Sequence, residues 1–152
     1  MRNISYLMKK DGKKIFGIKC DKMVKMTEKE LWKWIKKAQW KKDHNYKRIE
    51  KFYIVNLNPS QLMQLRSFVD KKLNALDKKY RKYWIDNIPI SDDSWMDLRA
   101  EVIGRGESFY KSITPAKLKK MGETGDYREC FDYSIPYEED IKSKFPDHWK
   151  AK

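Results

Sequence analysis

The middle of the chain reads SDDSWMDLRAEVIGRGESFY, from Ser91 to Tyr110. Its apolar residues recur at the three-four spacing of a helix, at Trp95, Leu98, Val102 and Ile103. Acidic residues at its start favour the positive end of a helix. Gly104 and Gly106 either end the helix or mark the close approach of another segment. We therefore expect a helix capped by Ser91 or by the next residue.

The clearest helical signal lies just upstream of this stretch. Asn58 is a good cap, Pro59 suits a first turn, and Gln61 stands at the third position. The helix should end near Asn87 because Pro89 follows. Its apolar side consists of Leu62, Leu65, Val69, Leu73, Leu76, Tyr80 and Tyr83.

Two further helices are predicted on either side. Thr27 and Glu30 form a capping-box pattern, and apolar residues follow at Leu31, Trp34, Ile35 and Ala38. Trp32 and Trp40 fall off that stripe, so they either wrap the edge of the core or stay exposed as stacking surfaces. A short helix is expected after Thr114, at Pro115.

The remaining segments carry β-type or undecided patterns. Residues 4–10 and 13–20 flank Asp11-Gly12 as a hairpin would, and Phe52 to Leu57 can form a third short strand. Residues 125–136 are rich in aromatic side chains at a spacing that fits a strand or a helix.

These patterns predict a mainly α fold, a compact helical domain with a small N-terminal β-hairpin. A length of 152 residues suits a single domain. We divide it into a hairpin extension (1–25), a helical core (26–133) and a C-terminal tail (134–152). The sequence shows no apolar run of membrane-spanning length and no signal-peptide pattern, so we expect a cytoplasmic protein that does not enter the membrane.

The charge of the chain is unevenly distributed. The net charge is +13, yet residues 1–90 hold 24 basic and 9 acidic side chains, whereas residues 91–152 hold 11 and 13. This asymmetry favours an anionic partner for the first half of the chain. A proteome in which Lys is the default surface residue would produce the same pattern.

Three segments together resemble a known family. They are MTEKELWKWI (residues 26–35), the helix from Pro59 to Trp84, and SDDSWMDLRAEVIGRG (residues 91–106) with Tyr110. From Met26 to Tyr133 the chain resembles the bacterial domain of unknown function 4240 family. The resemblance implies a mainly helical domain in a bacterial or phage setting, and it implies no reaction.

One set of residues could perform catalysis. Asp93, Asp97 and Glu101 recur every four residues and therefore share a helical face. With further ligands such as Glu129 or Asp132 they could hold Mg²⁺ and make a metal-dependent phosphoesterase. The alternative is a capped acidic face with Asp97 or Glu101 paired to a nearby arginine, and the sequence favours this non-enzymatic reading.

The basic surface points to a binding function instead, with no cofactor and no metal. We expect contact with nucleic acid, of little sequence specificity, through phosphate neutralisation and aromatic stacking. The alternative is a phage or bacterial factor that docks on an acidic host or defence-system protein. The candidate binding residues are Lys33, Lys36, Lys37, Lys41, Lys42, Lys47, Arg48, Lys71, Lys72, Lys78, Lys79, Lys82, Trp40 and Tyr46.

Overall fold

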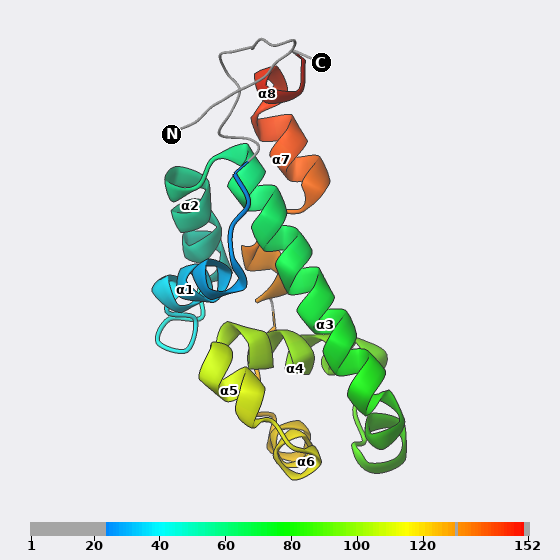
Figure 1. Ribbon diagram of the computed structural model, residues 1–152. Coiled ribbons are helices and arrows are strands. Elements are labelled where there is room, and N and C mark those ends of the chain that lie inside the picture. Colours follow the sequence, from blue (N-terminus) through cyan, green and yellow to red (C-terminus); the bar gives the residue numbers. More distant parts are fainter. Residues whose placement is uncertain (1–23, 130, 151–152) are drawn as a thin grey trace.

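The computed structural model describes residues 24–129 and 131–150, and the regular structure in that part of the chain is entirely helical. In chain order the elements are α1 (Glu28–Ala38), α2 (Tyr46–Asn56), α3 (Pro59–Asn87), α4 (Asp92–Gly104), α5 (Glu107–Ser112), α6 (Pro115–Thr124), the 3₁₀ turn η2 (Asp132–Ser134), α7 (Glu138–Lys144) and α8 (Pro146–Lys150). The mainly α prediction is confirmed (Figure 1). The predicted hairpin lies outside the described residues.

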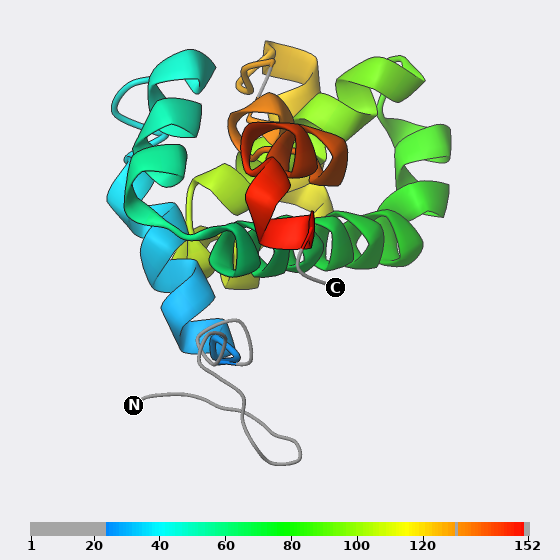
Figure 2. The ribbon, with the colours of Figure 1, turned by 90° about the horizontal axis from the view of Figure 1, so that it is seen from above.

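Helix α3 is the element against which most others pack. Its 29 residues span about 43 Å, and helices α1, α4, α6 and α7 all contact it. Figure 2 shows the other helices gathered along its length. The capping box at Asn58 and Gln61 and the end at Asn87 are as predicted. These local signals therefore set the longest element, and its apolar side sets the core.

Helix α1 begins with the predicted capping box. The backbone N–H of Glu30 donates to Thr27 Oγ1 at 3.1 Å, and the backbone N–H of Thr27 donates to Glu30 Oε1 at 2.8 Å. Those hydrogen bonds hold the pKa of Glu30 below its ordinary value. Trp32 and Trp40 are both buried, so the core-edge reading of these two residues is confirmed.

The expected third strand is wrong, because Phe52 to Asn56 belong to helix α2. The β-branched and aromatic composition of this run is overridden by burial at helical spacing. Ile49 and Tyr53 lie four residues apart, both are fully buried, and the Tyr53 hydroxyl donates to the carbonyl of Trp34 at 3.1 Å. Val55, whose β-branched side chain also favours strands, is 71% exposed on the surface of this helix.

Helix α4 crosses α3 and ends at Gly104. A Cβ atom added at Gly104 would lie 2.7 Å from Trp40 and 2.8 Å from Phe131. Gly104 therefore allows the close approach of two aromatic rings, whereas Gly106, with φ 103°, follows the end of the helix. Further along the same interface, Trp95 of α4 stacks on Trp84 of α3 with ring centroids 5.3 Å apart.

The segment from Asp132 to Ile135 is bound to α3 through a buried arginine. Arg66 donates to the carbonyls of Asp132 and Ile135 at 3.1 and 3.0 Å, and to Asp132 Oδ1 at 2.6 Å. The segment set apart as a C-terminal tail contains α7 and α8, and α7 packs on α3. Among the described residues, no helix is long and apolar enough to cross a membrane.

Candidate anion-binding surface

The three carboxylates of the predicted catalytic row occupy different environments. Asp93 is exposed in the first turn of α4, Asp97 is half-buried, and Glu101 is fully buried. Burial raises the pKa of Asp97, and the nearby carboxylates of Glu129, Asp93 and Asp132 raise it further. Within the part of the chain that the structure describes, no group of three His, Cys, Asp or Glu side chains is placed to hold a metal ion.

Glu101 is engaged in contacts that hold the fold together. Its Oε1 accepts hydrogen bonds from Trp40 Nε1 at 3.0 Å and from the backbone N–H of Arg128 at 2.9 Å. Its Oε2 accepts from Arg105 Nε at 2.8 Å and lies 3.8 Å from His44 Nε2. The sequence-based alternative, a pairing of Glu101 with Arg105, is present in the structure, and it gives this carboxylate a structural role.

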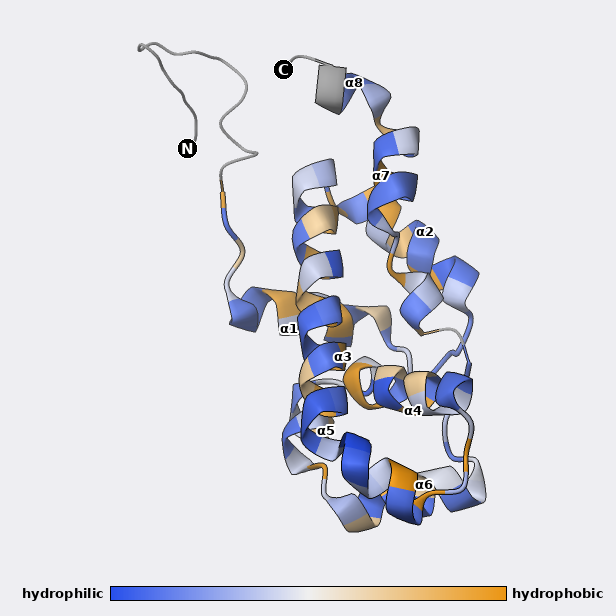
Figure 3. Cartoon of the chain, turned by 90° about the vertical axis from the view of Figure 1, so that its right-hand side faces the viewer, coloured by the Kyte–Doolittle hydropathy of each residue, from blue (hydrophilic) through white to orange (hydrophobic). Residues whose placement is uncertain are grey.

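The lysines of α3 are largely directed to solvent. Lys71, Lys78 and Lys82 follow one another at intervals of seven and four residues, which places them on one side of the helix. Hydrophilic residues cover much of the visible side of α3 in Figure 3. Two aspartates of the helix have partners, because Asp70 pairs with Arg66 and Asp77 pairs with Arg81 and accepts from Trp95. The third, Asp86, is exposed and lies four residues after Lys82.

The second half of α3 is the most open part of this basic surface. In residues 24–129 and 131–150, no ion-pair partner is found for Lys78, Lys79 or Lys82. Lys71, about two to three turns earlier, borders a cavity of about 730 Å³ that Glu138 and Glu139 also line. Acidic side chains therefore offset the charge of Lys71 more than that of the other three.

Helix α1 and the loop that follows it carry further exposed cations. Lys33, Lys36, Lys41 and Lys42 are exposed, and Lys37 lies with its Nζ 4.4 Å from the ring centroid of Trp34. Helices α1 and α3 both lie toward the viewer in Figure 1 and at the lower edge of Figure 2. The two helices thus lie on one side of the molecule, and both carry exposed lysines.

Two of the predicted binding cations already have partners. Lys72 Nζ lies 3.3 Å from Glu28 Oε2, in contact with the rings of Phe68 and Tyr110. Arg48 pairs with Asp43 at 2.6 Å and donates to the carbonyl of Ala38 at 2.8 Å. Both side chains join elements of the fold, so they are less free to meet a ligand.

The aromatic half of the prediction needs correction. Trp40 was a candidate stacking residue, but it is 0% exposed between His44, Phe131 and Glu101. Neither face of its indole ring is therefore accessible for a nucleotide base to stack on. Tyr53 and Tyr80 are also buried, whereas Tyr46 and Tyr83 are half-buried.

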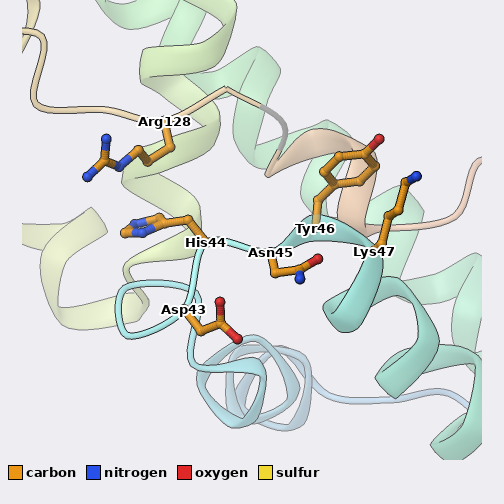
Figure 4. A pocket seen from close by; sticks show the side chains of 6 residues that line it. All are labelled: Asp43, His44, Asn45, Tyr46, Lys47 and Arg128. Atoms are coloured by element: carbon orange, nitrogen blue, oxygen red, sulfur yellow. The ribbon is translucent and has the colours of Figure 1, made fainter.

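A shallow depression opens beside the loop between α1 and α2. It encloses about 530 Å³ and is lined by Asp43, His44, Asn45, Tyr46, Lys47 and Arg128. Figure 4 shows His44 and Arg128 side by side at one end, and Tyr46 and Lys47 at the other. No local signal in the sequence connects His44 to Arg128, which lies far along the chain.

Comparison with known proteins gives one match. Residues 26–137 match the model of a family described as "Protein of unknown function (DUF4240)". No curated protein and no solved structure matches the chain significantly.

Proposed function

Because the chain belongs to the DUF4240 family, whose description names no activity, we propose a function from its own surface: a small basic, non-enzymatic protein that binds nucleic acid with little sequence specificity. The contact surface comprises the lysines of α1, of the loop after it and of the second half of α3.

The observation that carries this proposal is the charge balance of α3. Asp77 is bound by Arg81 and Trp95, while the neighbouring Lys78, Lys79 and Lys82 have no ion-pair partner among the residues described. Of the three, Lys79 Nζ lies 5.3 Å from the ring centroid of Tyr80. Lysines without an ion-pair partner can meet phosphate without breaking an ion pair, and they release the counterions condensed on a nucleic acid. That release supplies the free energy of binding.

The proposed mode is electrostatic. Phosphate contacts position a protein on nucleic acid without reading the bases. Base stacking adds little, because Trp32, Trp40, Tyr53 and Tyr80 are buried. The asymmetry of charge in the sequence and the outward direction of these lysines support binding to the backbone of DNA or RNA.

A charge-reversal experiment tests the proposal. The variant with Lys78→Glu, Lys79→Glu and Lys82→Glu should lose most of its affinity for labelled DNA and RNA at low salt. A matched variant with Lys117→Glu, Lys120→Glu and Lys144→Glu changes the net charge equally on α6 and α7, whose lysines at these positions are exposed. Equal losses in both variants, or no binding by the native chain, would overturn the proposal.

An acidic protein is the second candidate partner, as for a bacterial or phage factor that docks on a host or defence-system protein. One observation favours it. Ile85, 62% exposed, continues the lysine-bearing side of α3 beyond Lys82. An apolar side chain gains little from contact with a phosphate backbone, whereas the core of a protein interface buries such side chains. A partner that remains on the chain after nuclease treatment and is lost in Ile85→Asp would favour this candidate.

A further inference from the structure

Tyr133 is an exposed aromatic side chain in a segment that is otherwise buried. It is 54% exposed, whereas every other residue from 131 to 136 is buried. The η2 turn that carries it is fixed to α3, because Arg66 binds the carboxylate of Asp132 at 2.6 Å and the carbonyl of Ile135 at 3.0 Å. The ring of Tyr133 is therefore held toward solvent by an anchored turn, and such prior positioning lowers the entropic cost of binding a ligand.

A second ring and a lysine adjoin Tyr133. The ring of Tyr46, at the start of α2, makes a T-shaped contact with that of Tyr133, with centroids 6.1 Å apart. This contact occupies part of one ring surface and leaves the rest of Tyr133 open. Tyr46 also lines the depression beside His44, and Figure 4 shows Tyr46 and Lys47 extending side by side from the start of α2. In the described part of the chain, Lys47 has no ion-pair partner.

Charge alone contributes little at this place. Asp43 pairs with Arg48 at 2.6 Å, and the half-buried Glu50 lies one turn after Tyr46 on the same side of α2. An acidic side chain therefore accompanies the lysine. The feature that sets this surface apart from the lysine-bearing surface of α1 and α3 is its open aromatic ring.

We propose that Tyr133 stacks on an unpaired base of a single-stranded nucleic acid, with Tyr46 supporting the ring and Lys47 contacting a neighbouring phosphate. The inference rests on the nucleic-acid function proposed above and names a single strand as the substrate. Every base has a π-face, so an aromatic ring binds bases with little sequence preference. In a duplex the bases are stacked on one another, and only an unpaired strand can place a base on the ring.

The placement of the cations favours a strand over a free nucleotide. Figure 4 shows Arg128 at the opposite end of the depression, with its guanidinium directed away from Lys47. A ligand with a single phosphate meets only one of these cations. A strand carries a phosphate at every nucleotide, so different phosphates can meet cations that lie apart.

Two probes separate stacking from charge on the full chain. A short oligothymidylate and an abasic strand of the same length carry the same phosphates, and only the first has bases. The native protein should bind the oligothymidylate about tenfold more tightly. Tyr133→Leu should abolish this preference, and Tyr133→Phe should keep it, because the ring is what the base requires. The slope of log Kobs against log salt should stay the same in both variants, because neither removes a phosphate contact.

Lys47→Ala is the complementary control. It should weaken the binding of both strands by the same factor and lower the salt slope by about 0.7. Equal affinity of the native protein for the two strands would overturn the stacking site and leave the backbone-binding function standing. A preference that persists in Tyr133→Leu would also overturn it. Binding of neither strand would contradict the proposed function and this inference together.

Discussion

Trp40 Nε1 donates a hydrogen bond to Glu101 Oε1 at 3.0 Å, and both residues are fully buried although 61 positions separate them. The same carboxylate binds Arg105 and the backbone of Arg128. It therefore joins the loop after α1, helix α4 and the turn after α6 at one point.

Glu101→Gln should lower the free energy of unfolding by about 3 kcal/mol, because it breaks a buried ion pair and leaves Arg105 with only its exposed partner Asp126. Urea unfolding measures the change. The control is Glu107→Gln, which removes a carboxylate from a partly exposed i,i+4 pair with Lys111 and should cost under about 1 kcal/mol. Equal effects would show that Glu101 is not a structural hub.

Gly104→Ala should destabilise the protein by about 1–3 kcal/mol, because the new Cβ would lie 2.7 Å from Trp40 and force both packed rings to shift. Thermal unfolding monitored by near-ultraviolet circular dichroism follows the aromatic packing directly. An exposed substitution such as Ser67→Ala serves as the reference and should change stability by less than about 0.5 kcal/mol. An unchanged melting temperature in Gly104→Ala would contradict the close approach.

Asp97→Asn should stabilise the protein at pH 7, and the gain should shrink as pH falls. Burial raises the pKa of Asp97 in the folded state, so its ionised form weakens the fold above that pKa. The penalty disappears as pH falls through the raised pKa to below the ordinary value of 3.8. Urea unfolding between about pH 3.5 and about pH 8 gives the profile.

Asp92→Asn is the matched control for that experiment. Asp92 lies in the first turn of α4, where a negative charge is favourable, and it is not among the carboxylates that raise the pKa of Asp97, so its loss should destabilise slightly at pH 7. At pH 7 we expect Asp97→Asn to raise the free energy of unfolding and the control variant to lower it slightly. If Asp97→Asn is the less stable of the two at pH 7, the burial of Asp97 does not carry the cost assigned to it.

The slope of log Kobs against log salt should report how many phosphates the protein contacts. Replacing a lysine that contacts phosphate lowers the slope of log Kobs against log salt by about 0.9 for duplex DNA. Lys78→Ala and Lys82→Ala should each show this reduction, and the double variant should show about twice as much. Lys120→Ala on α6 should leave the slope unchanged. Slopes that do not respond to any of these changes would place the contact elsewhere.

Local sequence signals predicted the elements whose ends are set by neighbours in the chain. The capping boxes at Thr27 and Asn58, the proline after Asn87 and the end of α4 near Gly104 were all readable, because each depends on hydrogen bonds or steric limits within about four residues. The carboxylate row on α4 was also visible in outline. Its burial gradient from Asp93 to Glu101 was not, because spacing shows which residues share a face but not what covers that face.

The sequence by itself thus determined a helical, strongly basic protein with α3 as its longest element, because periodicity, caps and charge are properties of the chain segment. Tertiary structure alone decided that residues 52–56 join a helix, that Trp40 is buried, and that Arg128 meets His44. The reason is that burial depends on which faces of distant helices pack together. A contact such as that of Trp40 with Glu101 forms only once α1 and α4 have both packed against α3.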